Sequence, residues 1–184
     1  MTNSMFDLTG HVALITGGNS GIGLGMARGL AQAGADVCIW GTNAERNAAA
    51  AAELSEFGGR VRSMVCYVGD ETAVQESFAA VLEHFGRVDS CFANAGVSGA
   101  GVPFTETSLE EFRRVTRINL EGAFLTLRAA AAHMVERGGG GVLVGTSSVS
   151  TIHGAPRNQA YAASKAGLTA MLKGCAVELA RHGI

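Results

Sequence analysis

The sequence predicts an α/β fold in which a doubly wound parallel sheet carries helices on both faces. Short apolar runs alternate with longer segments whose apolar residues recur at helical spacing, a pattern typical of parallel sheets. The first run, residues 12–16, is followed at once by a glycine-rich turn and a helix. No repeat or linker interrupts the pattern, so we expect one domain over residues 1–184. Ligands of such a sheet are expected at the carboxyl ends of its strands.

The composition describes a folded chain of ordinary charge. The 184 residues carry a formal net charge of −2, and 47% of them are hydrophobic against 16% that are charged. This argues against nucleic acid or an anionic membrane as a partner. No apolar run approaches the ~18 residues that cross a bilayer, and the N-terminus lacks a signal peptide's apolar core. We therefore expect a cytoplasmic protein with reduced cysteines and, because its histidines are scattered, no metal site.

The glycine-rich turn T-G-G-N-S-G-I-G (residues 16–23) connects the first strand to a helix over residues 24–34. Glycines allow a tight turn and let the backbone approach a pyrophosphate, whose charge a helix N-terminus favours. The spacing is G-x-x-x-G-x-G rather than the plain G-x-G-x-x-G fingerprint. From this segment alone, a glycine turn without a ligand stays open as an alternative.

The second strand, residues 36–40, ends at Gly41 and Thr42. Dinucleotide folds place an acidic residue near this point when they bind the ribose hydroxyls of NAD. Here no carboxylate is present to repel a 2′-phosphate, although no arginine or lysine occupies these positions or the glycine turn. We therefore expect a modest preference for NADP over NAD.

The middle of the chain continues the alternation, with helices over residues 45–57 and 71–85 and strands over 61–68 and 89–93. Tyr67 could stack on an adenine, or it could be a plain residue at a strand end. Ser108 to Glu111 form a capping box that opens a long helix. Asn119 stands next to the buried face of that helix, and spacing alone favours an asparagine that is satisfied by backbone hydrogen bonds.

The last strand and helix carry the strongest chemical signal. A fifth strand, residues 141–147, precedes Ser148, and a helix over residues 161–182 begins with Tyr161 and Lys165. Residues four apart share one side of a helix, so the lysine ammonium can lie beside the tyrosine ring. A neighbouring cation lowers a phenol pKa from about 10, which makes tyrosine usable as a general acid or base. A lone pair of this kind is also common on surface helices.

These motifs together resemble the classical short-chain dehydrogenase/reductase family, which has a Rossmann-like fold. The resemblance covers nearly the whole chain and implies an NAD(P)(H)-dependent oxidoreductase that interconverts a small-molecule carbonyl and a secondary alcohol. It implies that Tyr161 is the general acid or base and that Ser148 polarises the carbonyl oxygen. Lys165 would lower the tyrosine pKa and hold the nicotinamide ribose, and Asn119 would position a relay water.

The resemblance also implies the cofactor contacts. Ala93 replaces the first asparagine of the family's N-N-A-G, and Tyr67 stands where the family usually has an aspartate, so adenine recognition stays open. The helices with Asn119 and Tyr161 would pair in a homodimer or homotetramer. The expected cofactor-binding residues are Gly17, Asn19, Ser20, Gly21, Ile22, Gly23, Thr42, Val68, Asn94, Ala95, Gly96, Tyr161 and Lys165.

Family members continue beyond the point that corresponds to residue 184 with further strands and a substrate loop. We therefore expect a single domain that is incomplete at its C-terminal end, with five of the family's strands. The fifth strand would be an unprotected apolar edge, and the chain would be a fragile fold and a poor enzyme. The alternative function is a truncated nucleotide-binding domain without turnover. The substrate is not predicted, because its specificity residues normally lie in the absent region.

Overall fold

The computed structural model describes residues 6–184, and these form a five-stranded parallel sheet with the order β3-β2-β1-β4-β5. The strands are β1 (Val12–Thr16), β2 (Asp36–Gly41), β3 (Val61–Val65), β4 (Ser90–Ala93) and β5 (Val142–Gly145). The α-helices are α1 (Gly21–Gln32), α2 (Ala44–Ser55), α3 (Glu71–Phe85), α4 (Leu109–Thr116), α5 (Gly122–Arg137) and α6 (Gln159–Leu179).

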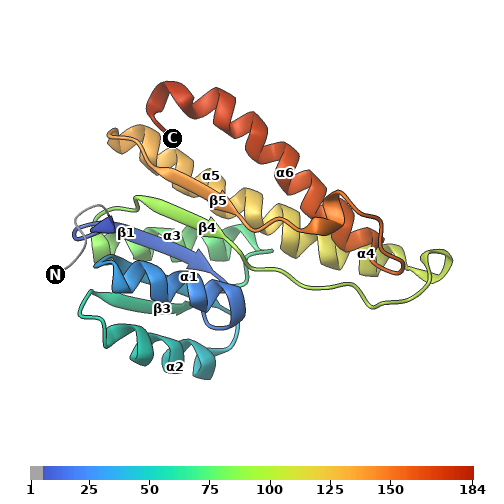
Figure 1. Cartoon of the computed structure of the whole chain (residues 1–184), viewed down its shortest axis with the longest axis horizontal. Coiled ribbons are helices and arrows are strands. Elements are labelled where there is room, and N and C mark those ends of the chain that lie inside the picture. The colour runs from blue at the N-terminus through green and yellow to red at the C-terminus, as the bar shows by residue number, and fades with distance from the viewer. Residues whose placement is uncertain (1–5) are drawn as a thin grey trace.

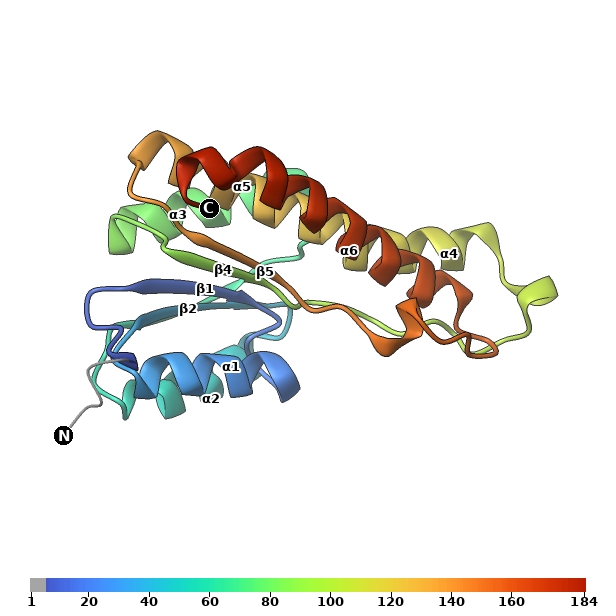
Figure 2. The same ribbon diagram turned by 45° about the horizontal axis from the view of Figure 1, so that its top comes forward.

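The helices form a layer on each face of the sheet. Helices α1 and α2 cover one face, and α3, α5 and α6 cover the other (Figures 1 and 2). The chain moves outward from β1 to β3 and then returns to place β4 on the other side of β1. This reversal is the topological switch point at which open parallel sheets bind ligands. The predicted doubly wound fold is therefore confirmed.

Each face of the sheet has its own apolar core. All five residues of β1 are buried, as a central parallel strand requires when helices cover both of its sides. Leu14 and Trp40 pack with α3, α5 and α6, whereas Ile15 and Ile39 pack with the alanines of α1 and α2. The alternation along β1 and β2 thus sends successive side chains into two different cores.

Several predicted boundaries differ from the structure. Strand β3 ends at Val65 rather than residue 68, because its last partner is Gly41 at the end of β2. Strand β5 likewise ends at Gly145, where its ladder with β4 ends. The long helix after Ser108 is interrupted by a π-helical turn at Arg117–Glu121. Only half of its predicted capping box forms, because Ser108 Oγ accepts from Glu111 N at 3.1 Å while the Glu111 carboxylate pairs with Arg114.

Strand β5 is the edge of the sheet within residues 6–184, since it pairs only with β4. Val142 at its start is half exposed. In the same part of the chain, no helix is long and apolar enough to span a membrane. No group of three or more histidine, cysteine, aspartate or glutamate side chains there could hold a metal ion.

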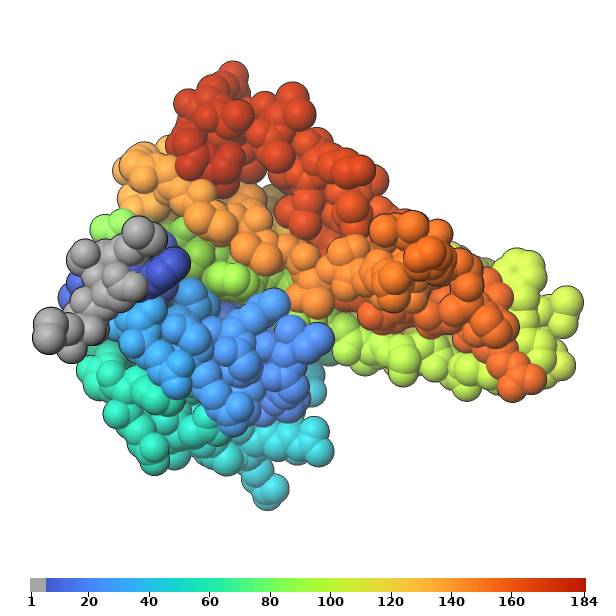
Figure 3. Space-filling view, in the orientation of Figure 1, coloured from blue at the N-terminus to red at the C-terminus, as the bar shows by residue number. Residues whose placement is uncertain are grey.

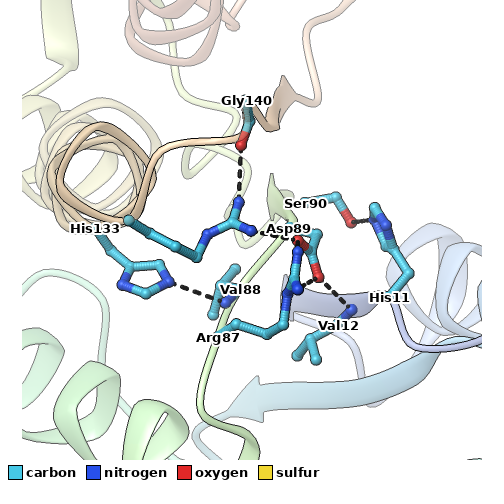
Figure 4. A network of polar contacts seen from close by, with 9 residues as sticks. His11, Val12, Arg87, Val88, Asp89, Ser90, His133 and Gly140 are labelled. Carbon is cyan, nitrogen blue, oxygen red and sulfur yellow. Dashed lines mark hydrogen bonds and ion pairs between the residues drawn. The ribbon is translucent and has the colours of Figure 1, made fainter. Parts of the chain in front are cut away.

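A polar network joins the amino ends of β1 and β4 to helix α5 (Figure 4). The buried Asp89 carboxylate accepts from Val12 N at 2.9 Å and forms ion pairs with Arg87 and Arg137. Nearby, His133 Nε2 accepts a hydrogen bond from the backbone N–H of Val88 at 3.2 Å. The network lies at the opposite end of the sheet from the switch point, so we assign it a structural role.

Candidate active site

A cavity of about 370 Å³ opens at the carboxyl ends of β1, β2 and β4, on the switch point of the sheet. Its wall consists of the glycine turn after β1, the end of β2 with the start of α2, residues 66–68 after β3, and residues 94–97 after β4. Beyond it, the segments around α4 and the start of α6 project past the sheet, as Figure 3 shows in yellow-green and orange. The fold therefore brings strand ends that are distant in sequence to one site.

The start of α1 suits an anion. No side chain caps this helix, so the N–H groups of its first turn have no side-chain acceptor. Two glycines shape the turn: Gly17 has a φ of +64°, and a Cβ at Gly23 would lie 2.3 Å from the Gly17 carbonyl oxygen. Free N–H groups, close backbone approach and the helix dipole fit the pyrophosphate of a dinucleotide.

Asn94 joins the end of β1 to the segment that follows β5. Its Nδ2 donates to Thr16 O at 3.0 Å, and its Oδ1 accepts from Thr146 Oγ1 at 3.1 Å. The hydroxyl of Thr16 in turn accepts from the backbone N–H groups of Asn94 and Ala95, both at 3.0 Å. Thr16 was missed as a site residue, although a hydroxyl at the end of an apolar run was a signal that could have indicated it.

Tyr161 and Lys165 lie together near the start of α6, as the spacing predicts. Lys165 is 3% exposed, and its Nζ lies 5.7 Å from the centre of the Tyr161 ring. The same Nζ donates to Thr146 O at 2.8 Å, which holds the ammonium at the carboxyl end of β5. Burial lowers the pKa of Lys165 below its ordinary value. The pair is therefore a buried cation beside a phenol at the sheet's carboxyl edge.

Asn119 lies fully buried in the π-helical turn between α4 and α5. Its Oδ1 accepts from Val97 N at 2.8 Å, and its Nδ2 donates to Val97 O and to Ser164 Oγ at 2.9 and 3.1 Å. This is the backbone-satisfied asparagine that spacing alone favours. A Cβ on Gly96 would lie 3.2 Å from Asn119 Oδ1 and 3.3 Å from Lys165 Nζ, so glycine lets both side chains approach the strand end.

Ser148 follows β5, and its hydroxyl caps the short 3-10 turn Val149–Thr151 by accepting from Ser150 N at 3.1 Å. The hydroxyls of Ser148 and Ser150 are 3.2 Å apart. Within residues 6–184, no hydrogen bond connects Ser148 to Tyr161. The joint action of these two hydroxyls on one oxygen atom therefore stays a prediction.

The predicted cofactor residues fall into three groups. Gly21, Ile22 and Gly23 form the first turn of α1 beside the cavity, whereas Tyr161 and Lys165 lie outside its wall. The residues in the wall itself are Gly17, Asn19, Ser20, Thr42, Val68, Asn94, Ala95 and Gly96.

Arg46 is a wall residue that the sequence analysis missed. It belongs to the first turn of α2, which begins just after Thr42, so the helix turns its side chain back to the strand end. Tyr67, which is 41% exposed, also lines the wall. Among residues 6–184, no acidic side chain lines this cavity.

A switch-point cavity with an uncapped helix start, and a tyrosine–lysine pair at the same sheet edge, are features that a nucleotide-dependent oxidoreductase requires. The family model described as short chain dehydrogenase matches residues 11–184. The chain belongs to the short-chain dehydrogenase family, and it is an NAD(P)-dependent oxidoreductase of that family.

Named relatives span much of this chain. It is 35% identical to a 2,5-dichloro-2,5-cyclohexadiene-1,4-diol dehydrogenase of Sphingobium indicum, over 98% of this chain and 71% of the relative. It is 38% identical to a levodione reductase of Leifsonia aquatica, over 96% of this chain and 66% of the relative. Its structure is similar to that of an NAD⁺-bound xylitol dehydrogenase, with a TM-score of 0.93 and 36% identity, over 96% of this chain and 68% of the other.

Proposed function

We propose that this protein interconverts a carbonyl and a secondary alcohol, with Tyr161 as the group that exchanges a proton with the substrate oxygen. The observation that carries the proposal is the buried Lys165 ammonium, 5.7 Å from the Tyr161 ring and held by Thr146 O at 2.8 Å. A cation fixed beside the tyrosine can stabilise the negative charge that develops on its oxygen during proton transfer, which suits Tyr161 to the role of general acid or base.

A nicotinamide dinucleotide, when bound, would supply or accept the hydride at the carbonyl carbon. The first turn of α1 and the glycine turn would hold its pyrophosphate. Lys165 and Tyr161 would contact the nicotinamide ribose, and Thr42, Arg46 and Val68 would face the adenosine end. The assignments of Thr42, Arg46 and Val68 are supported by their place in the wall of the cavity, whereas those of Tyr161 and Lys165, which lie outside that wall, rest on the family resemblance.

Ser148 and Asn119 have supporting roles in this proposal. The Ser148 hydroxyl would polarise the carbonyl oxygen that Tyr161 protonates during reduction. The Asn119 amide is already used by Val97 and Ser164, so a relay contact from this residue would come from its backbone carbonyl. A π-helical turn interrupts the regular helical hydrogen bonds, and such turns are frequent at functional sites.

Substitution of the tyrosine hydroxyl tests the assigned chemistry. We expect Tyr161→Phe to reduce turnover of a ketone panel by at least about 100-fold, within the usual range for general acid–base catalysis. Cofactor affinity in a fluorescence titration should stay nearly unchanged, because only one oxygen is removed. A mutant with wild-type kcat would refute the mechanism. Wild-type protein that binds NADPH but turns over no ketone or alcohol would instead support the alternative of a nucleotide-binding domain without turnover.

We also propose a modest preference for NADP(H). The lining of the cavity contains Arg46 and lacks an acidic residue at the end of β2, which leaves a 2′-phosphate attracted rather than repelled. Arg46→Ala should therefore weaken NADPH binding by several-fold and leave NADH binding unchanged. Arg28→Ala is the matched control, since Arg28 pairs with Glu53 away from the cavity. Tighter binding of NADH by the wild type would contradict the preference.

Self-association through α5 and α6 is proposed on the apolar surface between them. A cavity of about 190 Å³ lies there, and Phe124, Met171 and Leu179 line it. Phe124 is 43% exposed in the single chain. Light scattering should give a dimer or tetramer that Phe124→Glu dissociates. A monomeric wild-type protein would contradict this proposal.

A further inference from the structure

A buried amide lies under the adenosine end of the cavity. Asn47 in α2 is 2% exposed, and its Nδ2 donates to Gly41 O at 3.0 Å and to Met64 O at 2.9 Å. Its Oδ1 accepts from Asn19 Nδ2 at 2.7 Å. Because two carbonyl oxygens face one end of this amide, that end must be the nitrogen. The orientation of Asn47 is thus fixed by the ends of β2 and β3.

The fixed amide of Asn47 determines the orientation of the next one. Asn47 presents an oxygen to Asn19, and an oxygen can only accept, so Asn19 must turn its Nδ2 toward it. The Oδ1 of Asn19 then faces the other way and lies 3.4 Å from Ser20 Oγ. Asn19 and Ser20 both line the cavity, whereas Asn47 does not. Asn47 therefore fixes which end of the Asn19 amide points away from it, although Asn47 itself does not line the cavity.

The same two amides fill the space beside Gly41. A Cβ at this position would lie 2.3 Å from Asn19 Nδ2 and 2.6 Å from Asn47 Oδ1, both far inside van der Waals contact. Dinucleotide sites that select NAD place a carboxylate near the end of this strand. In this chain, a carboxylate at residue 41 has no room while the amide pair is in place.

We propose that Asn47 is a positioning residue that sets the choice of cofactor. It holds Asn19 at the wall of the cavity, and with Asn19 it excludes a carboxylate at the end of β2. The pocket is thereby kept receptive to an adenosine that carries a 2′-phosphate. This inference rests on the proposed NADP(H) preference and adds the residue that enforces it.

A stability cycle tests the amide pair without any cofactor. Gly41→Ala should lower the melting temperature of the wild type, because the new methyl group must displace Asn19. In an Asn47→Ala background, Gly41→Ala should lower the melting temperature much less. The clash with Asn47 Oδ1 is then absent, and Asn19 has lost the partner that holds its amide in place. Gly25→Ala is the control, since a Cβ there meets nothing within 4 Å. Equal losses from Gly41→Ala in both backgrounds would overturn the inference. Asn19→Ala replaces Asn47→Ala if the latter does not fold.

A binding cycle tests the effect on specificity. Gly41→Asp alone should weaken NADPH and NADH alike. Adding Asn47→Ala should restore NADH binding by about tenfold while NADPH stays weak, a coupling in the usual range for contacting residues. The inference is overturned if Gly41→Asp alone switches the protein cleanly to NADH. If the wild type shows no NADP(H) preference, the proposed specificity fails, and the stability cycle still decides whether the amide pair fills this space.

Discussion

Removal of the Asp89 carboxylate is expected to destabilise the fold strongly, although Asp89 lies at the end of the sheet opposite the candidate active site. This side chain is 7% exposed, and it holds the buried N–H of Val12 and the guanidinium groups of Arg87 and Arg137. Arg87 is half exposed and can turn toward water, so the loss of its ion pair contributes little to the free-energy cost of the substitution. Arg137 is only 20% exposed and would keep an unpaired charge in place.

The expected magnitude follows from these contacts. An orphaned buried N–H costs about 1–3 kcal/mol, and loss of one partner of a buried ion pair costs about 3–5 kcal/mol. The two losses overlap, because one carboxylate serves both, so we expect Asp89→Ala to cost about 3–5 kcal/mol in total. At about 2–4 °C per kcal/mol for a chain of this length, the melting temperature should fall by about 6–20 °C.

Urea denaturation followed by circular dichroism measures this loss, with the slope m required to stay unchanged. Asp89→Asn separates the two causes, since it keeps an acceptor for Val12 N but removes the charge, and it should cost less. Glu53→Ala is the matched control, because it breaks only an exposed ion pair with Arg28 and should therefore lower stability far less than Asp89→Ala. A loss of stability for Asp89→Ala no larger than that measured for Glu53→Ala would refute the reasoning.

Two further predictions concern acid and the site. Burial and the charge of Arg137 lower the pKa of His133 below 6.5, so the unfolded chain binds the extra proton, and stability should fall as the pH drops through about 6.5. Burial by itself would raise the pKa of Asp89, but hydrogen bonds from Arg87 and from the Val12 N–H, together with the positive charge of Arg87, outweigh it and lower the pKa in the folded state. A second loss of stability should therefore follow as the pH drops below the ordinary pKa of 3.8. Urea titrations over this pH range check both, and His133→Gln should remove the first step alone. Separately, Gly96→Ala should reduce kcat by up to about 100-fold with little change in melting temperature, because its methyl group crowds the side chains of Asn119 and Lys165; an unchanged kcat would contradict this.

The expectation that the domain is incomplete at its C-terminal end stays a prediction, as does a cytoplasmic location. The chain covers 71% of the diol dehydrogenase and 68% of the xylitol dehydrogenase to which it is similar. Comparing the melting temperature and kcat/KM of this chain with those of a version extended to the length of its relatives tests the first expectation. Equal values would contradict it.

The sequence alone determined the order of the elements and much of the site. Apolar runs such as residues 12–16 mark buried parallel strands because both of their faces are covered, and helical spacing places Lys165 beside Tyr161 whatever the surrounding fold. The glycine turn was readable because part of what requires its glycines is local: Gly17 has a φ of +64°, and a Cβ at Gly23 would meet the Gly17 carbonyl oxygen.

Only the tertiary structure decided which distant side chains share one space. The register of β2 with β3 ends the third strand at Val65, and no local pattern records that limit. Arg46 reaches the cavity because α2 packs against the strand end, and Asn47 is fixed by carbonyl groups of two neighbouring strands. Such contacts depend on how strands pair and helices pack across the sheet, and separation along the chain does not encode these distances.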